Sequence, residues 1–184
     1  AIYSLVGALT TACAALAFVL TPWLVHLLVP GFSPAMRDLT GRLMRIMLLT
    51  PIIFGLSGVS MAILNAHQHF LLPALAPIAY NLSIILGALF LAPTLGVYGL
   101  AVGVTVGACL HLLIQVPGLR RYGWAYTPIL GLHLPDVREV IGLFLPRMFG
   151  LAIMQLNFIV NVVLASGLSE GSLPALNYAF LLMM

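Results

Sequence analysis

The sequence contains very little charge, and this scarcity excludes most soluble proteins. Charged side chains make up 6% of its 184 residues, whereas a soluble domain carries roughly 25%. Lysine is absent, so the net charge of +3 comes from seven arginines set against four carboxylates. These side chains are too few to cover the surface of a soluble fold of this length. We therefore interpret the arginine excess as a membrane-topology signal rather than as affinity for nucleic acid.

The longest stretch without charge separates Arg45 from Arg120. A transmembrane helix needs roughly 20 apolar residues, so this stretch has room for about three crossings. Backbone amides in lipid must be hydrogen-bonded within the spanning structure, which is therefore either helical or a closed barrel. The apolar runs are continuous and lack the alternating pattern of barrel strands. We therefore predict an all-α fold, a polytopic transmembrane helix bundle.

Residues suited to catalysis or disulfide formation are also scarce. Cys13 and Cys109 both lie in apolar runs, so they indicate neither a disulfide nor a redox compartment. The carboxylates all lie at or near expected membrane edges: Asp38, Asp136, Glu139 and Glu170. The HExxH, Walker and GxSxG motifs are absent. We therefore expect no enzyme activity and no cofactor.

Histidines are the remaining candidates for a metal site. His67 and His69 flank Gln68 in an expected loop, but no Cys, Asp or Glu lies near them in the sequence. A zinc or similar site needs more ligands than this pair supplies. We interpret both as loop histidines, and His26 and His111 near span ends as interfacial residues, and we expect no metal.

Turn signals divide the sequence into about five full spans and the start of a sixth helix. The expected spans cover residues 2–28, 33–65, 73–91, 97–117 and 136–166, and the last helix starts near Ser172. Ser33 followed by Pro34 is a helix-start signal, with a hydroxyl at the N-cap and proline at the first helical position. Residues 93–96 predict a tight turn. Asp136 and Glu139 fit a variant of the capping box.

Short turns make neighbouring spans antiparallel, so the connections alternate between two sides of the membrane. One side collects the N-terminus, the His67 loop and the long connection over residues 120–138. Arginines are slightly more frequent on that side, which predicts that it is cytoplasmic. Tyr122, Trp124 and Tyr126 in the long connection are expected interface anchors. Because the chain begins and stops inside apolar runs, we expect an internal fragment of a longer polypeptide.

Small residues recur at every fourth position in two spans. Gly99, Gly103 and Gly107 share one face of the fourth span, and small residues at this spacing let helix backbones approach closely in lipid. Close helix packing is the favoured interpretation, and a role in a moving interface is the alternative. The same spacing recurs in the first span at Gly7, Thr11 and Ala15.

The fifth span carries the most polar side chains: Arg147, Gln155, Asn157 and Asn161. Polar groups within a membrane helix are costly and are therefore candidates for function. At about 100° per residue, Arg147 and Asn161 lie within roughly 40° of each other and Asn157 is a further 40° away, with Gln155 on the far flank. We take the four as candidates for lining a substrate cavity. Hydrogen bonding between helices, with an arginine that extends to the interface, remains an open alternative.

Several segments, in order along the chain, resemble the MurJ/MviN family. Residues 43–47 and 62–65 are similar to its LLRI and GAILN segments, and Gln115 with Pro117 is similar to a Q-x-P-x-L helix ending. The F-x-x-PAFAP-x-x-xN segment is matched by Phe70, Pro73, Ala74, Ala76, Pro77 and Asn81. The following helices are matched at Leu145, Pro146, Gln155, Asn161, Ala165, Ser166, Gly171, Ser172, Ala175, Leu176, Tyr178, Ala179, Leu182 and Met183.

This resemblance implies a fourteen-helix transporter with two lobes, of which this chain would supply the third to seventh helices and the beginning of the eighth. Residues 1–119 would belong to the N-terminal lobe, 120–138 to a cytoplasmic inter-lobe loop, and 139–184 to the start of the C-terminal lobe. The implied function is flipping lipid II, a peptidoglycan precursor for the cell wall, across the bacterial cytoplasmic membrane by alternating access. The implied partners are this undecaprenyl-pyrophosphate lipid-linked oligosaccharide and membrane lipids, with no nucleic acid.

The chain departs from the family at one motif. The family's Y-A-D-R-L-M segment reads Tyr178-Ala179-Phe180-Leu181-Leu182-Met183 here, so Phe180 and Leu181 replace an Asp-Arg pair implied to contact pyrophosphate. That contact is not carried over, and Arg147 is our candidate for supplying part of the missing positive charge. The resemblance places the family in the MATE-like exporter superfamily. Another exporter of polysaccharide-linked lipids or drugs from that superfamily, or a non-transporting membrane scaffold, remains an alternative.

Overall fold

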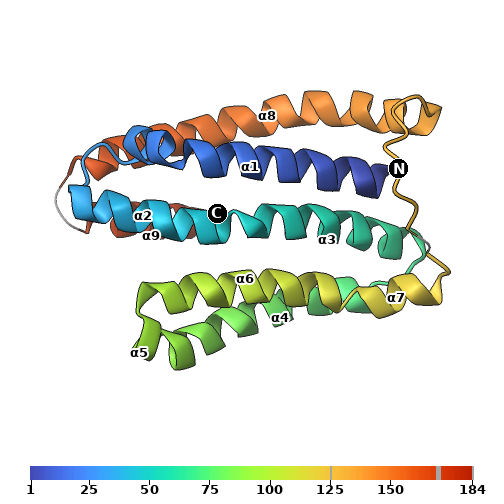
Figure 1. The fold of residues 1–184 in the computed structure, drawn as a ribbon, viewed down its shortest axis with the longest axis horizontal. Coiled ribbons are helices and arrows are strands. Elements are labelled where there is room, and N and C mark those ends of the chain that lie inside the picture. The colour runs from blue at the N-terminus through green and yellow to red at the C-terminus, as the bar shows by residue number, and fades with distance from the viewer. Residues whose placement is uncertain (125, 169–170, 184) are drawn as a thin grey trace. The chain divides into compact units, whose positions relative to one another are not determined.

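A computed structural model describes residues 1–124, 126–168 and 171–183. Glu170 and the other undescribed positions lie outside these ranges. Every regular element within the described ranges is a helix (Figure 1). Five helical stretches are long and apolar enough to cross a membrane: Ile2–Leu28, Pro34–Ala66, Leu71–Leu95, Val97–Arg121 and Pro135–Ser166. The chain is an all-α, multi-pass membrane protein, as the composition predicts.

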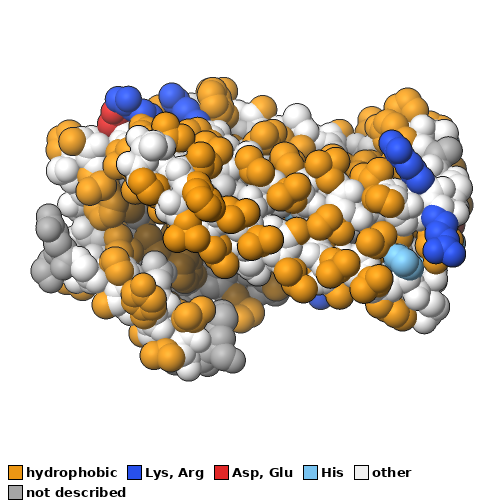
Figure 2. Space-filling model, turned by 90° about the horizontal axis from the view of Figure 1, so that it is seen from below, with side chains coloured by type: hydrophobic (Ala, Val, Ile, Leu, Met, Phe, Trp, Pro, Cys, Tyr) orange, Lys and Arg blue, Asp and Glu red, His pale blue; other side chains and the backbone are white. Residues whose placement is uncertain are grey.

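Much of the apolar surface is open rather than packed. Val19 and Leu143 are each 72% exposed, and Figure 2 shows hydrophobic side chains over most of the face in view. A soluble monomer rarely exposes large continuous apolar patches, because contact of such a surface with water is unfavourable. Lipid supplies the missing apolar environment.

The helices form two compact units, one comprising Ala1–Val19 with Leu43–Leu132 and the other comprising Leu20–Arg42 with His133–Met184. The first helix, α1 (Ile2–Leu28), contributes to both units. The expected division into two lobes concerns the longer protein and stays a prediction.

The second span is divided by a one-residue break that the sequence pattern does not predict. Helix α2 (Pro34–Met47) ends before Leu48, and α3 (Leu49–Ala66) follows. Pro51 has no N–H to donate to the carbonyl of Met47, four residues earlier. The Thr50 hydroxyl donates to that carbonyl instead, at 2.7 Å. At the start of α2, the Ser33 hydroxyl accepts a hydrogen bond from the N–H of Met36 at 3.4 Å, which confirms the expected N-cap.

The third span extends further than expected. Helix α4 (Leu71–Leu86) continues through a π-helical turn, η1 (Gly87–Leu91), into α5 (Ala92–Leu95). The expected turn over residues 93–96 is therefore wrong, because proline is tolerated in a first helical turn and Pro93 lies in the first turn of α5. The reversal occurs at Gly96 alone, whose φ of 58° suits a residue without Cβ.

The long polar connection is shorter than expected. Helix α6 (Val97–Leu113) is followed by α7 (Val116–Arg121), so residues 118–121 are helical. Helix α8 (Pro135–Ser166) begins with Leu134 as the N-cap and Pro135 at its first position, and it makes no side-chain capping bond. The expected capping box of Asp136 and Glu139 is therefore wrong: Pro135 starts the helix earlier, and Asp136 lies within the first turn. There its charge favourably faces the helix dipole.

Each unit has its own packing core. In the first unit α4, η1 and α5 form a hairpin with α6, and α3 lies along α6 on another side (Figure 1). In the second unit α8 contacts α9 (Ser172–Met183). In that unit a Cβ on Gly41 of α2 would lie 3.6 Å from Thr21 and 3.8 Å from Val25 of α1, which places α2 against the second half of α1.

Candidate functional site

The four predicted cavity residues all lie on α8. Arg147, Gln155 and Asn157 are exposed, and Asn161 is half-buried. The Asn161 amide donates to the backbone carbonyl of Asn157 at 2.8 Å and to its side-chain oxygen at 3.1 Å. The two asparagines therefore share a face of α8, and the hydrogen bonds between them satisfy part of their hydrogen-bonding capacity. Their role in a substrate cavity stays a prediction.

Arg147 lies next to an interruption in the backbone bonding of α8. Pro146 is inside the helix, and because proline lacks an N–H the carbonyl of Gly142 loses its usual partner. A Cβ on Gly142 would meet nothing within 4 Å. Among the described residues, no carboxylate forms an ion pair with Arg147. The helix thus presents an exposed guanidinium directly after a proline interruption.

The position that departs from the family motif is part of an apolar contact. The ring of Phe180 on α9 lies 5.6 Å from the ring of Phe158 on α8, at an interplanar angle of 60°. Aromatic pairs at this separation and tilt are stabilising. Phe180 therefore links α8 to α9 by packing, and Leu181 beside it is 73% exposed.

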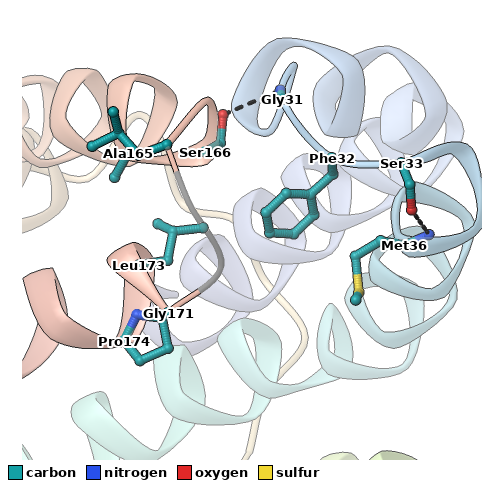
Figure 3. A pocket seen from close by; sticks show the side chains of 10 residues that line it. Gly31, Phe32, Ser33, Met36, Ala165, Ser166, Gly171, Leu173 and Pro174 are labelled. Carbon is teal, nitrogen blue, oxygen red and sulfur yellow. Dashed lines mark hydrogen bonds between the residues drawn. The ribbon is translucent and has the colours of Figure 1, made fainter.

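A cavity of about 540 Å³ lies in the second unit, where the α1–α2 turn meets the turn between α8 and α9. The Ser166 hydroxyl accepts a hydrogen bond from the N–H of Gly31 at 3.3 Å, as Figure 3 shows. A Cβ on Gly31 would lie 2.0 Å from the Ser166 carbonyl oxygen, so only glycine fits there. The remaining lining is mainly apolar, with Phe32, Met36, Ala165, Leu168, Leu173 and Pro174. The four predicted cavity residues of α8 (Arg147, Gln155, Asn157 and Asn161) are not among the residues that line this cavity.

A second cavity, of about 680 Å³, lies in the first unit along the small-residue face of α1. Gly7, Thr11 and Ala15 line it together with Leu56 of α3 and Tyr126 of the long connection. The predicted small-residue face of α1 therefore borders an open groove. This face approaches α3 closely at Gly7, where a Cβ would lie 3.2 Å from the side chain of Leu56.

The glycines of α6 lie against the third span. A Cβ on Gly99 would be 2.5 Å from the backbone carbon of Leu91, and a Cβ on Gly103 would be 3.1 Å from the Cα of Gly87. A Cβ on Gly107 would meet the carbonyl oxygen of Tyr80 at 2.9 Å. The two helix backbones are thus in direct contact along this face.

A hydrogen bond also crosses this seam. The Ser83 hydroxyl donates to the carbonyl of Gly103 at 2.9 Å, and both residues are buried. Interhelical bonds of this kind are an ordinary means of fixing packed membrane helices.

Sequence reasoning missed a buried polar cluster formed by Ser57 of α3, His111 of α6 and Gln115. Ser57 and Gln115 are fully buried and His111 is 8% exposed, so the interpretation of His111 as interfacial is wrong. The Ser57 hydroxyl lies 2.7 Å from Nδ1 of His111, and Nε2 of Gln115 donates to the same hydroxyl at 2.6 Å. The i, i+4 spacing of His111 and Gln115 was the signal available in the sequence.

Aromatic side chains gather at one end of the first unit. The ring of Tyr3 lies 5.1 Å from that of Trp124 and 5.9 Å from that of Tyr126. His67 stacks on Tyr122 with ring centroids 4.4 Å apart. The start of the chain, the His67 loop and the beginning of the long connection therefore meet at this end, with the amphipathic rings typical of a membrane interface.

The other histidines and acidic groups do not converge. Within the described residues, no group of three or more His, Cys, Asp or Glu side chains is placed to hold a metal ion. His26 lies 3.0 Å from the guanidinium of Arg37, which also donates to the carbonyl of Pro30. These bonds join the end of α1 to the start of α2.

Comparison with known proteins adds a family assignment to this geometry. A family model described as the lipid II flippase MurJ matches residues 1–184. The chain belongs to the MurJ lipid II flippase family. It is similar to the lipid II flippase MurJ of Burkholderia cenocepacia, with 36% identity over 145 residues that cover 76% of this chain and 28% of that protein.

Two further relatives carry the same family name. A probable lipid II flippase MurJ of Haemophilus influenzae is 32% identical over 120 residues, which cover 64% of this chain and 24% of that protein. The corresponding protein of Vibrio cholerae is 30% identical over 161 residues, covering 85% of this chain and 30% of that protein. The chain thus spans only about a quarter to a third of the length of these MurJ relatives.

Proposed function

We propose that the full-length protein containing this chain is a flippase that moves lipid II across the bacterial cytoplasmic membrane by alternating access. The observation that carries the proposal is the MurJ family match along all 184 residues. Five apolar helical spans and an all-helical fold suit a transporter of this kind. The expected ligand is a lipid-linked oligosaccharide of the undecaprenyl-pyrophosphate type.

Arg147 is our proposed contact for the anionic part of that ligand. A guanidinium is a strong, geometrically selective donor to phosphate oxygens. Arg147 is exposed on α8, and among the described residues it has no ion-pair partner, so its donors remain available. Asn157 and Asn161, about three and four turns further along α8, would supply further donors to sugar or phosphate oxygens.

The test is complementation of a bacterium depleted of its own lipid II flippase, using the full-length protein. Wild type should restore growth and the appearance of lipid II at the outer face, detected with a membrane-impermeant reagent. Arg147→Ala should weaken substrate binding by about 2 kcal/mol, the usual worth of a hydrogen bond to a charged group, or roughly thirtyfold. Arg147→Lys should retain part of the activity.

Arg121→Ala is the matched control, because Arg121 is an exposed arginine at the end of α7 and is not one of the predicted cavity residues of α8. It should complement as wild type does. Normal transport by Arg147→Ala at normal protein levels would remove Arg147 from the substrate path. Failure of the wild type to complement, despite correct membrane insertion, would overturn the flippase proposal itself.

One observation favours a second candidate function. Phe180 and Leu181 occupy the positions of the expected Asp-Arg pair, and Phe180 packs on Phe158. An apolar surface at that position is what we expect of an exporter of a different lipid-linked or apolar substrate, or of a membrane scaffold. Restoring the pair by Phe180→Asp with Leu181→Arg separates these alternatives: improved complementation indicates a lipid II flippase with a weakened site.

A further inference from the structure

The cluster of Ser57, His111 and Gln115 places an ionisable side chain inside the first unit. An ionisable group within membrane helices is costly to maintain and is a functional-site candidate by default. Gln115 and Ser57 are fully buried, and the side-chain oxygen Oε1 of Gln115 has no hydrogen-bond partner. A buried polar atom without a partner calls for an explanation beyond packing.

The hydrogen bonds of the cluster define which atoms carry hydrogens. Nε2 of Gln115 donates to the carbonyl oxygen of His111 at 2.8 Å and to the Ser57 hydroxyl at 2.6 Å. The reversed amide would set an oxygen against that carbonyl, so this orientation is the favourable one. The Ser57 hydroxyl accepts from Gln115, and with a neutral imidazole protonated on Nε2 its own hydrogen points to Nδ1 of His111, 2.7 Å away. In this arrangement His111 is neutral, with its proton on Nε2.

Protonation of Nδ1 would reverse one bond of the cluster. Nδ1 would then donate to the Ser57 oxygen, and the serine hydrogen would turn to the carbonyl of His111, which lies 3.4 Å from that oxygen. After the cluster has taken up a proton, the serine hydroxyl, Nδ1 of His111 and Nε2 of Gln115 each still have a hydrogen-bond partner. The new hydrogen bond from the serine to the carbonyl, at 3.4 Å, is longer than the 2.7 Å bond to Nδ1 that it replaces, so the serine hydroxyl is held less tightly.

The surroundings supply no negative charge for a protonated His111. The elements packed against α6 are α3, α4, η1, α5 and α7, and none of them contains Asp or Glu. Their titratable or charged side chains are Tyr80 of α4, which contacts Phe54 beside His111, and Arg120 and Arg121 of α7. Helix α6 itself adds Tyr98 and Cys109. A charged imidazolium here is stabilised by water more than by these neighbours.

The cluster also closes the break in the fourth span. The N–H of Gln115 bonds to the carbonyl of Leu112, three residues back, at 3.1 Å. This leaves the carbonyl of His111 without its usual backbone donor, and the Gln115 side chain takes that place. The same side chains that hold the histidine therefore hold α6 and α7 together and link them to α3.

We propose that His111 is a proton-binding site of the transport cycle, and that proton uptake loosens the junction between α3 and the α6–α7 break. The ligand is the proton, and Ser57 and Gln115 are the positioning residues that hold the imidazole. A neutral His111 favours the closed, dry junction, whereas a protonated His111 favours an arrangement that admits water. This inference rests on the proposed flippase function and names its coupling ion.

The experiment uses the full-length protein in liposomes, with lipid II flipping measured between about pH 5 and 8, where a histidine titrates most often. Flipping by the wild type should change several-fold over this range. His111→Asn keeps an acceptor near Nδ1 but never carries a charge, so its profile should be flat. Ser57→Ala keeps the histidine and should move the midpoint of the profile. His133→Asn, at an exposed loop position, should behave as the wild type.

Melting temperatures of the same proteins in detergent give a second measurement that does not depend on flipping. Acidification from about pH 8 to 5 should lower the melting temperature of the wild type relative to His111→Asn. A wild type that flips lipid II with the same pH profile as His111→Asn, or with no pH dependence, overturns the proton site. If no protein flips lipid II, the flippase proposal fails. The melting temperatures then test the proton site alone, and an equal pH dependence of the melting temperature in wild type and His111→Asn rejects it.

Discussion

At the scale of single residues, the glycines of α6 set how closely the third and fourth spans approach. A Cβ on Gly99 would lie 2.5 Å from the carbonyl carbon of Leu91 and 2.6 Å from the nitrogen of Ala92. Both are backbone atoms, so neither moves aside as the end of a flexible side chain would. Steric conflict of this kind costs about 1–3 kcal/mol in a packed core.

We therefore expect Gly99→Ala to lower the free energy of unfolding by about 1–3 kcal/mol. Gly58→Ala is the matched control, because Gly58 lies within α3 and a Cβ there would meet nothing within 4 Å. That substitution should instead stabilise by about 0.5–1 kcal/mol, since alanine loses less backbone entropy in a helix. Thermal unfolding of both variants in detergent measures the difference, and equal effects would contradict the packing role of Gly99.

The sequence identified which residues are small or polar, but not their partners. The four-residue spacing predicted a packing face on α6, and yet the equivalent face of α1 borders a cavity. His111 was interpreted as interfacial because it lies near a span end. It is in fact buried, and its hydrogen-bond partner Ser57 is 54 positions away in the sequence. Partners at such separations follow from tertiary packing, which a pattern along one chain does not encode.

At the scale of elements, the break between α2 and α3 depends on two neighbouring residues. The Thr50 hydroxyl donates to the Met47 carbonyl that Pro51 leaves without a backbone donor. Thr50→Val should therefore lower the free energy of unfolding by about 1 kcal/mol, the usual net worth of one hydrogen bond. In a Pro51→Ala background the same substitution should cost nothing, because the backbone N–H restored by the alanine then bonds to the Met47 carbonyl.

A double-mutant cycle tests this coupling. Free energies of unfolding are measured for wild type, each single variant and the double variant, and the coupling is the part that is not additive. Additive effects would show that the Thr50 hydroxyl does not replace the missing backbone bond.

The elements themselves were largely predictable, because span length and turn residues are local properties. The first span was confirmed at both ends, and the Ser33–Pro34 start of α2 was confirmed as well. The errors lie where two local signals compete. Pro135 outweighs the capping-box pattern at Asp136, and the third span continues through a π-helical turn and past Pro93 to Leu95. The break at Leu48 was missed because Pro51 lies inside an otherwise uninterrupted apolar run.

At the scale of the whole molecule, the order of spans predicts which connections share a side of the membrane. In the first unit, contacts of Tyr3 with Trp124 and of His67 with Tyr122 bring three chain segments to one end. The arginines in and beside the connection after α7 favour the cytoplasm for that end. The turns at Gly96 and after Ser166 should then face outward.

Single cysteines introduced into a full-length protein lacking Cys13 and Cys109 test this arrangement. Ala66→Cys and Thr127→Cys should be protected from a membrane-impermeant maleimide added to intact cells, and Thr94→Cys and Leu168→Cys should react. All four positions are exposed in the structure, so each should react once the membrane is permeabilised, which controls for local burial. Because each span reverses the direction of the chain, one helical stretch that does not cross would invert the labelling of every position after it. Reaction of Ala66→Cys and Thr127→Cys but not of the other two would instead invert the whole topology and reject the cytoplasmic assignment.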